Sequence, residues 1–247
     1  MRQGMSHNAR SAMFAPLDQT GRAEAVTTRL MDAITLGLLT DGEHLPSEAE
    51  LAGQFGVSTV TVREALVALR QHGLVETRRG RGGGSFVKAP AEPSRASWQE
   101  RLRLISLSDL RDVGDHYLAV AGAAAKLAAE RSSPEDIERL VLATEDIRTA
   151  TGTEASRAER QFHLEVAAAA QSPRLTHQEV QLQSERGGLL WLPFGADESQ
   201  QAAYAEHRAI TGAIAQADGD LARKLTEEHI LDAIHRLADV HLTLLAP

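Results

Sequence analysis

The chain has 247 residues, a formal net charge of −8 and no cysteine. Its length allows two domains, its 43% hydrophobic content excludes a wholly disordered protein, and the lack of cysteine excludes disulfides and thiolate metal ligands. No apolar run approaches the length of a membrane span, and residues 1–20 lack the apolar core of a signal peptide. We therefore expect a cytoplasmic protein, without a membrane partner, whose first 20 residues form a flexible arm.

Residues 45–73 have the pattern of two short helices joined by a tight turn. Ser47 followed three residues later by Glu50 is a capping box for the first helix. Gly56 is a residue type that ends a helix at a positive φ angle, and Ser58 is a suitable cap for the second helix. The pattern predicts a helix-turn-helix, whose second helix reads base edges in the major groove.

A hairpin with a basic, glycine-rich tip is predicted after the second helix. Residues 74–78 and 85–88 are strand-like, and Arg79-Gly80-Arg81-Gly82-Gly83-Gly84 joins them. Glycine lets a backbone approach a groove closely, and arginine pairs with phosphates or enters the minor groove. Such a hairpin is the wing of a winged helix. A capped helical pair used only for packing is the alternative, but it leaves the wing unexplained.

Residues 58–88 contain six lysines or arginines and two acids, within an acidic chain. This local positive charge favours a DNA-binding module. The candidate DNA contacts are the two capping serines, the polar residues at the start of the second helix, and the wing. They are Ser47, Ser58, Thr59, Thr61, Arg63, Arg78, Arg79, Arg81 and Gly82.

The segment 89–97 contains two prolines and has no periodicity, which predicts a linker between a DNA-binding domain at 21–88 and a second domain at 98–247. Beyond it, alanine, leucine, glutamate and arginine recur at helical spacing, so the second domain is expected to be all-α. Helices are predicted at about 108–131, 134–150, 154–170, from Pro173 onward, at 198–217 and at 220–242. The predicted fold is mainly α: a winged helix-turn-helix followed by a bundle of six or seven helices.

Three histidines and one glutamate of the second domain are candidate metal ligands. Glu159 and His163 lie one helical turn apart, and His207 and His229 lie on the last two predicted helices. Imidazole and carboxylate suit a borderline divalent metal. A histidine on a helix is more often a surface or hydrogen-bonded residue, so the pattern alone leaves both interpretations open.

The N-terminal motifs resemble the winged-helix domain of the GntR family of bacterial transcription regulators. The resemblance covers roughly residues 23–88 and rests on Leu-Pro-Ser-Glu at 45–48, Val-Ser at 57–58, Val-Arg-Glu-Ala-Leu at 62–66 and Gly-Leu-Val at 73–75. Members commonly carry arginines at the positions of Ala49 and Thr59 that help to read a guanine or hold phosphates. Arg63 is the arginine retained here.

The C-terminal motifs resemble the FCD ligand-binding domain of the FadR subfamily. They are Phe162-His163, Glu206-His207-Arg208-Ala209-Ile210 and Glu228-His229-Ile230. The resemblance implies a metal site with Glu159 in place of the usual aspartate, holding zinc, with nickel or manganese also possible. It also implies a carboxylate effector clamped by an arginine, and Tyr117 occupies that arginine's position. Possible effector-binding residues are Arg111, His116, Tyr117 and Arg186.

The resemblance implies a DNA-binding transcription regulator rather than an enzyme. The protein is expected to bind a palindromic double-stranded operator as a homodimer and to act as a repressor. A small metabolite, expected to be an organic acid, would modulate binding. Two alternatives remain at this point: a metal-dependent hydrolase-like helical domain fused to a DNA-binding module, and a helical domain that serves only for dimerisation.

Overall fold

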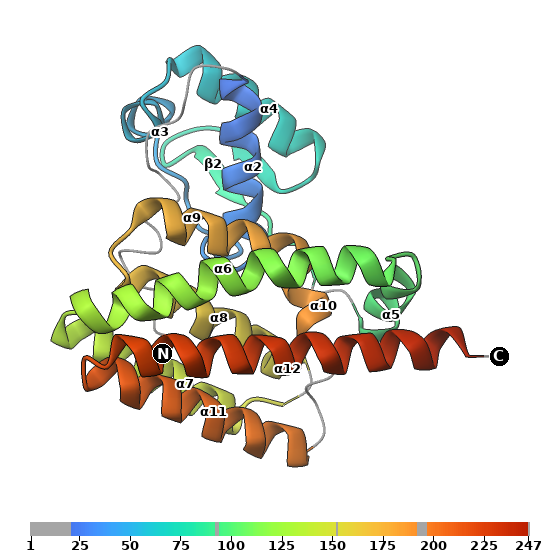
Figure 1. The fold of residues 1–247 in the computed structure, drawn as a ribbon. Coiled ribbons are helices and arrows are strands. Elements are labelled where there is room, and N and C mark those ends of the chain that lie inside the picture. The colour runs from blue at the N-terminus through green and yellow to red at the C-terminus, as the bar shows by residue number, and fades with distance from the viewer. Residues whose placement is uncertain (1–20, 92–93, 152, 192–196, 247) are drawn as a thin grey trace. The chain divides into compact units, whose positions relative to one another are not determined.

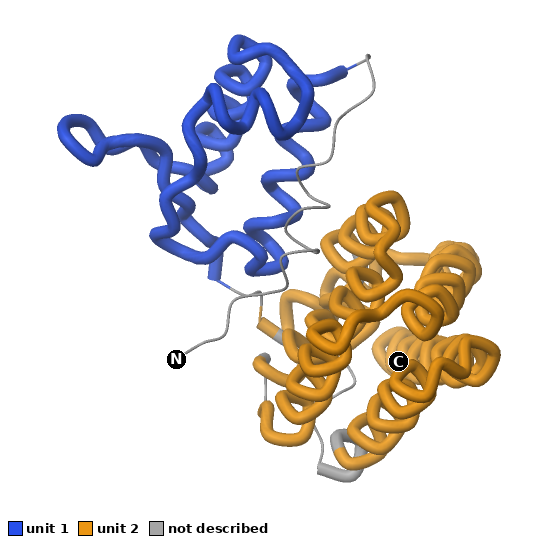
Figure 2. Tube along the Cα trace, turned by 90° about the vertical axis from the view of Figure 1, so that its left-hand side faces the viewer, with its two compact units in different colours: residues 1–91 blue, residues 92–247 orange. Residues whose placement is uncertain are grey.

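The computed structural model describes residues 21–91, 94–151, 153–191 and 197–246. The chain divides into two compact units, residues 1–91 and 92–247 (Figure 2). Within the described ranges there are eleven α-helices, one π-helical turn and one two-stranded sheet, so the mainly-α fold class is confirmed. The predicted arm, residues 1–20, lies outside the described residues.

The N-terminal unit is the predicted winged helix. Ser47 accepts a hydrogen bond from the Glu50 amide, and the Glu50 carboxylate accepts one from the Ser47 amide, so both halves of the capping box form. Gly56 ends the first helix of the motif at a φ of 66°, and Ser58 caps the second. The elements are α2 (Arg22–Thr35), α3 (Glu48–Phe55), α4 (Thr59–Gln71), β1 (Val75–Arg78) and β2 (Gly84–Val87).

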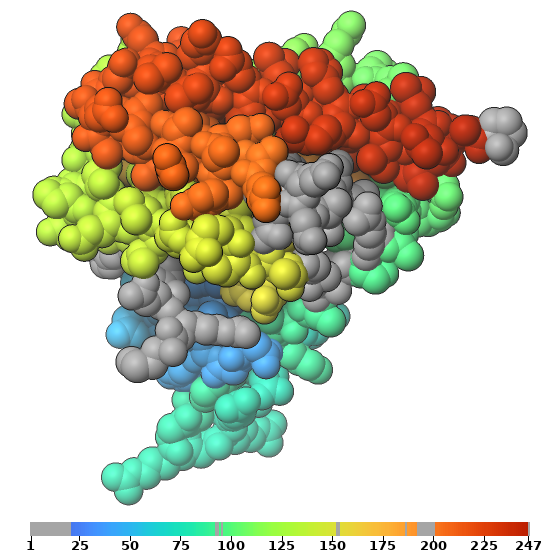
Figure 3. All heavy atoms as spheres, turned by 90° about the horizontal axis from the view of Figure 1, so that it is seen from below, coloured from blue at the N-terminus to red at the C-terminus, as the bar shows by residue number. Residues whose placement is uncertain are grey.

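The wing is an antiparallel hairpin whose register runs from Val75 opposite Val87 to Arg78 opposite Gly84. In Figure 3 it is the teal segment that projects from the rest of the N-terminal unit. A Cβ atom at Gly83 would lie 2.4 Å from the Arg78 carbonyl oxygen, so the turn closes only because this position has no side chain. The glycines of the tip are therefore required for the shape of the turn.

The C-terminal unit contains every helix that the sequence predicted, with ends that differ by a few residues. Two short helices, α5 and α10, were not predicted. The elements are α5 (Arg95–Arg103), α6 (Leu107–Arg131), α7 (Pro134–Thr149), α8 (Thr153–Ala169), α9 (Pro173–Leu182), the π-helical turn η1 (Gln183–Gly187), α10 (Gly188–Leu190), α11 (Asp197–Ala215) and α12 (Gly219–Leu245).

The predicted linker, 89–97, is wrong at its C-terminal end because α5 begins at Arg95. Ser94 caps this helix by accepting a hydrogen bond from the Ser97 amide at 3.2 Å. The serine is an N-cap residue type, but the segment has too few apolar residues for a helical periodicity. None of the helices in the described ranges combines the length and apolar character that crossing a membrane requires.

Helices α6 and α12 lie side by side along the C-terminal unit (Figure 1). Their close approach depends on small residues, because a Cβ atom at Gly114 of α6 would lie 2.5 Å from Ile234 Cδ1 of α12. α7 packs against both α8 and α11. Fully buried side chains such as Phe162 and Ile230 fill the interior between these helices. The candidate metal ligands lie in this interior.

Candidate metal centre and nucleic-acid interface

The structure brings together all four residues predicted as metal ligands. Glu159 and His163 come from α8, His207 from α11 and His229 from α12. One ligand atom of each lies within 4.8 Å of the others, and all four residues are buried. The spacing in the sequence predicted that Glu159 and His163 are neighbours. His207 and His229 join them only because α8, α11 and α12 pack together.

Each of these residues leaves one buried polar atom without a hydrogen-bond partner among the described residues. The atoms are the Nε2 atoms of His163, His207 and His229, and Oε2 of Glu159. His207 Nε2 and Glu159 Oε2 lie 3.0 Å apart, and they form an ion pair only when His207 carries a proton on both nitrogens. Buried polar atoms are normally hydrogen-bonded, so four such atoms that face one another without a hydrogen bond fit a cation bound among them.

The spacing of the cluster also fits a single ion. A zinc–ligand distance of about 2.1 Å means that two ligands of one ion lie at most about 4.2 Å apart. Glu159 Oε2 is 3.0 Å from His207 Nε2 and 3.9 Å from His229 Nε2. Because all four donors lie within 4.8 Å of one another, a contraction of less than about 1 Å brings them within ligand distance of one ion.

Hydrogen bonds on the outer nitrogens orient two of the imidazoles. His207 Nδ1 lies 2.6 Å from the Ala203 carbonyl oxygen, which can only accept, so this nitrogen carries the proton. His229 Nδ1 lies 2.6 Å from Glu206 Oε2. Both contacts direct an Nε2 lone pair toward the cluster, as metal-binding histidines require. The sequence did not predict this role of Glu206. The residue precedes His207 in the chain, but its carboxylate contacts His229.

The protonation states suit metal binding at two of the three histidines. Burial holds the pKa of His163 well below its usual value, and the neighbouring His229 and His207 lower it further. Burial likewise lowers the pKa of His229. At His207 burial acts in the same direction, but the Glu159 carboxylate, the hydrogen bond to Ala203 and the Glu206 carboxylate together outweigh it and raise the pKa. His163 and His229 are therefore neutral near pH 7, and His207 is the first of the three to take up a proton as the pH falls.

Beside the cluster, Tyr117 takes part in a buried polar network rather than an arginine clamp. Its hydroxyl donates to Glu179 Oε1 at 2.8 Å, and Gln183 Nε2 donates to the same carboxylate oxygen. Trp191 donates to Gln183 Oε1 at 3.0 Å and stacks on His163, with ring centroids 4.7 Å apart. Burial raises the pKa of Glu179 to about 7. The network links residues up to 74 positions apart, from Tyr117 to Trp191, and sequence reasoning missed it.

The other predicted effector residues are not brought to the cluster by the structure. Arg111 and His116 are exposed on α6, on a different face from the buried Tyr117. Helical periodicity explains this, since a residue next to a buried position points about 100° away from it. The side chain of Arg186 lies outside what the structure describes.

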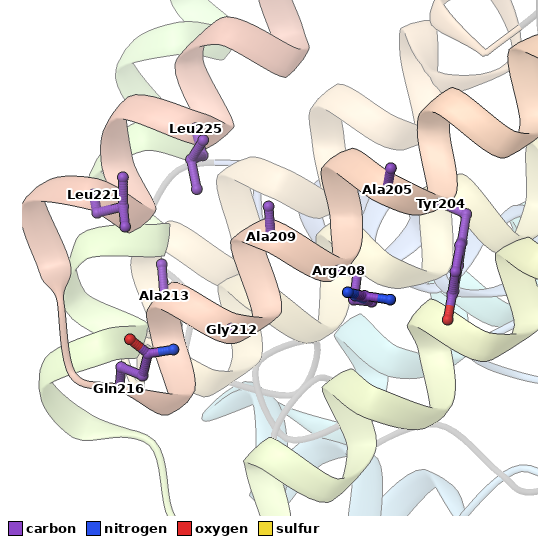
Figure 4. Close-up of a pocket in the computed structure, with 9 residues that line it drawn as sticks. All are labelled: Tyr204, Ala205, Arg208, Ala209, Gly212, Ala213, Gln216, Leu221 and Leu225. Carbon is purple, nitrogen blue, oxygen red and sulfur yellow. The ribbon is translucent and has the colours of Figure 1, made fainter.

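A hollow of about 550 Å³ lies between α11 and α12 (Figure 4). It contains none of the four clustered residues, although His207 belongs to the same helix α11. Small residues of α11 form most of its floor, and α12 contributes two leucines. The lining residues are Tyr204, Ala205, Arg208, Ala209, Gly212, Ala213, Gln216, Leu221 and Leu225. The hollow and the metal cluster are thus separate features.

In the winged helix, the start of α4 presents part of the predicted DNA-contacting set. Thr59 and Arg63 are exposed, whereas Thr61 is partly buried and hydrogen-bonds Ser58 through its hydroxyl at 2.9 Å. The hydroxyl of Ser47 is engaged with Glu50 in the capping box. The two capping serines and Thr61 therefore hold the motif together, and Arg63 is the long donor on the exposed face.

The predicted wing residues Arg78, Arg79, Arg81 and Gly82 are all exposed. Arg78 differs from the other arginines because it pairs with Glu76 at 2.7 Å and lies over the Phe86 ring at 4.1 Å. Arg79 and Arg81 form no ion pair with the residues that the structure describes. These two arginines are therefore the wing cations with the most freedom to meet phosphates.

Comparisons with known proteins agree with both halves of this structure. The model of the family of bacterial regulatory proteins called gntR matches residues 22–84, and that of the FCD domain matches residues 112–232. RmpR of Mycobacterium gastri, described as an HTH-type transcriptional regulator, is 43% identical over 237 residues, which cover 95% of this chain and 86% of that protein. The chain belongs to the GntR family. It is a DNA-binding transcription regulator with an FCD effector-binding domain, and its families and relatives are transcription regulators rather than enzymes.

Other relatives support the same family membership. An Escherichia coli protein described as an L-lactate dehydrogenase operon regulatory protein is 30% identical over 226 residues, covering 84% of this chain and 83% of that protein. The solved structure of E. coli McbR/YncC has a TM-score of 0.52 at 20% identity, over 90% of this chain and 99% of that one. This last likeness, at 20% identity, concerns the fold alone.

Proposed function

We propose that this GntR regulator represses transcription from a palindromic operator, and that a small organic acid bound at a metal in the FCD domain modulates its DNA affinity. The observation that carries the proposal is the group of four buried, unpaired ligand atoms inside the effector-binding domain. Unpaired buried groups are costly, so their persistence in a packed core argues for a ligand. A domain used only for dimerisation has no need of such a site.

Glu159, His163, His207 and His229 would hold the metal. Three imidazole nitrogens and one carboxylate oxygen suit zinc, and also nickel or manganese. When bound, the ion would offer its remaining coordination positions to oxygen atoms of an effector. Zinc and nickel are preferred to manganese because their affinity for such nitrogen-rich ligand sets is higher.

An effector with carboxylate or hydroxyl oxygens suits this site through the metal rather than through an arginine. Tyr117 occupies the position expected for the clamp, and its hydroxyl is engaged with Glu179. A metal ion is a strong local positive charge, so it can compensate for the missing guanidinium. One relative is named for an L-lactate dehydrogenase operon, which makes L-lactate a suitable first probe.

Regulation would follow from thermodynamic linkage. A single winged helix makes few contacts, so specific binding calls for two copies on a two-fold symmetric site. We propose that Arg63 reads a base in each half-site and that the wing arginines meet phosphates. An effector that prefers one arrangement of the dimer changes operator affinity, and operator DNA changes effector affinity by the same factor.

The proposal can be tested with an operator selected from a random DNA pool by the full-length protein. Operator affinity is then measured by fluorescence anisotropy for zinc-loaded protein, with and without L-lactate or a panel of other small hydroxy and carboxylic acids. We expect at least one acid to change the affinity by fivefold or more, roughly the lower limit of allosteric coupling. The same acid should have no effect on chelator-treated protein.

A reporter gene placed behind the selected operator tests the direction of regulation, and repression predicts lower expression with the regulator present. Unchanged operator affinity with every acid and every metal would contradict effector control and favour a purely dimerising helical domain. Recovery of a non-palindromic site occupied by one chain would contradict the homodimer.

A further inference from the structure

The exposed guanidinium of Arg63 is attached to a carboxylate on the neighbouring helix. Arg63 Nε donates to Glu48 Oε1 and Oε2 at 3.3 and 3.1 Å, and Nη2 donates to Oε2 at 2.7 Å. Glu48 is the first residue of α3, and Arg63 lies in the second turn of α4 (both helices are labelled in Figure 1). The pair therefore connects the two helices of the helix-turn-helix at their N-terminal ends.

This pair is not needed to hold α3 and α4 together. The side chains of Arg63 and Glu48 are 61% and 38% exposed, and ion pairs this exposed contribute little to stability. The two helices are joined by buried apolar side chains, including Leu51, Phe55 and Leu66. The consequence of the pair is therefore the orientation of the arginine rather than the stability of the fold.

The contact uses one edge of the guanidinium and leaves the other free. Arginine has five N–H donors in a planar fork. Glu48 takes Nε–H and one hydrogen of Nη2, so both Nη1 hydrogens and the second Nη2 hydrogen stay available. The end formed by Nη1 and Nη2 still presents two parallel N–H groups, which can pair with O6 and N7 of a guanine in the major groove. The carboxylate thus occupies one bidentate edge of the guanidinium and leaves the Nη1/Nη2 edge for a base.

We propose that Glu48 is a positioning residue that determines sequence specificity, because it holds the Arg63 guanidinium with its free edge directed at a guanine. This inference rests on the proposed role of Arg63 in reading a base. An arginine that is ordered before binding loses less side-chain entropy on meeting the base. The carboxylate also repels phosphates, which disfavours contacts between this part of α4 and DNA of any sequence.

The two effects of Glu48 give a signature that a simple contact would not produce. Removal of its charge should weaken binding to the operator, because Arg63 is no longer oriented. The same change should leave binding to random DNA unchanged or stronger, because a negative charge near the phosphates is lost. An arginine or lysine that contacts only phosphate changes both affinities in the same direction when it is removed.

The experiment compares E48Q with E64Q in the full-length protein. Glu64 follows Arg63 on the exposed side of α4 and forms no ion pair within the described part of the chain, so E64Q removes the same charge without releasing the arginine. Affinities are measured by anisotropy for the selected operator, for a random duplex, and for operators with each guanine replaced. R63A and the double variant R63A/E48Q complete a cycle.

We expect E48Q to lower the operator-to-random affinity ratio by about three- to tenfold for each half-site, with the loss confined to one guanine position. E64Q should leave this ratio unchanged, and E48Q should have no further effect on it in the R63A background. Melting temperatures should match that of the parent protein. An unchanged ratio in E48Q would overturn the inference.

Two further outcomes separate the inference from the proposal beneath it. If E48Q lowers the ratio equally with and without Arg63, Glu48 contacts a base itself and the positioning role is wrong. If R63A leaves the ratio and the guanine preference unchanged, the base contact proposed for Arg63 fails before Glu48 is considered.

Discussion

At the scale of single residues, the metal cluster depends on hydrogen-bond acceptors outside it that orient its histidine rings. Glu206 accepts the hydrogen bond from His229 Nδ1, and the Ala203 carbonyl accepts the one from His207. Burial opposes ionisation of Glu206, but this hydrogen bond and the His229 ring still keep its pKa below the usual value. A charged carboxylate on the outer nitrogen increases the basicity of the ligand nitrogen.

We therefore expect E206Q to weaken metal binding by about 10- to 100-fold, the usual cost of losing such a partner. Competition with a chromophoric chelator measures the affinity. Glu228 precedes His229 on α12 but pairs with Lys224 at 3.8 Å, so E228Q removes a nearby charge without touching the cluster. Equal affinity in E206Q and E228Q would show that Glu206 does not orient His229.

Glu179 gives the protein a pH-dependent stability with a defined sign. Its pKa is raised from 4.5 to about 7 by burial, so the folded state binds this proton more tightly than the unfolded state. As the pH rises from 4.5 to about 7, the free energy of unfolding therefore decreases. Above the folded-state pKa, the whole stabilising contribution of the bound proton is lost. A shift of this size corresponds to about 3 kcal/mol.

The variant E179Q should lose this part of the pH dependence. Free energies of unfolding are measured by urea denaturation at pH 5 and pH 8 in the presence of chelator, so that metal binding does not contribute. The parent protein should lose about 2.5 kcal/mol more than the variant between these pH values, because part of the effect is already lost below pH 5 and histidine titrations are common to both. Parallel losses would mean that Glu179 is already ionised at pH 5.

At the scale of elements, the wing differs from α4 in the kind of DNA contact it can make. Arg79 and Arg81 extend from a hairpin tip shaped by glycines, and Arg78 is restrained by Glu76 and Phe86. Such a tip can follow the backbone of any sequence. Arg63 instead lies on a rigid helix beside a carboxylate, which suits contact with one base.

Replacement of Arg78, Arg79 and Arg81 by alanine should therefore weaken binding to all DNA. Fewer counterions would be released, so the slope of log affinity against log salt should become shallower by about one unit for each arginine that meets a phosphate. Titrations at several salt concentrations measure the slope, and R223A on α12 serves as a charge control outside the winged helix. A slope identical to that of the parent protein would show that the wing does not contact DNA.

At the scale of the whole molecule, the metal should couple α8, α11 and α12, since each supplies at least one ligand. An ion that binds the folded state alone stabilises it according to its concentration, by about 2.7 kcal/mol at 100 times the dissociation constant. We expect about one zinc, nickel or manganese ion per chain in protein purified without chelator. Occupancy should decrease as the pH falls, because His207, whose pKa is raised, takes up a proton first.

The matched variants are H207A in the cluster and H116A on the exposed face of α6. Chelator should lower the melting temperature of the parent protein and of H116A but not that of H207A, which has lost the site. Elemental analysis and thermal denaturation give the two readouts. Absence of metal in the parent protein, even after reloading with zinc or nickel, would exclude the site.

The sequence by itself determined the elements whose signals are local. A capping box needs only residues three apart, as in Ser47 and Glu50, and a turn needs one glycine such as Gly56. The winged helix, most helices of the bundle and the four metal-cluster residues could therefore be predicted from contiguous motifs and from the family resemblance. The helix α5 was missed because its few apolar residues show no periodicity.

Only the tertiary structure decided which side chains meet across the fold. Glu48 and Arg63 are 15 residues apart, Glu206 and His229 are 23 apart, and Tyr117 and Glu179 are 62 apart. No local hydrogen-bond pattern specifies such pairs, because they depend on how packed helices are rotated against one another. For the same reason the sequence proposed Arg111 and His116 for a pocket, whereas the helix turns both toward solvent. The unpaired state of the four ligand atoms likewise follows from packing, which removes water and leaves them facing one another.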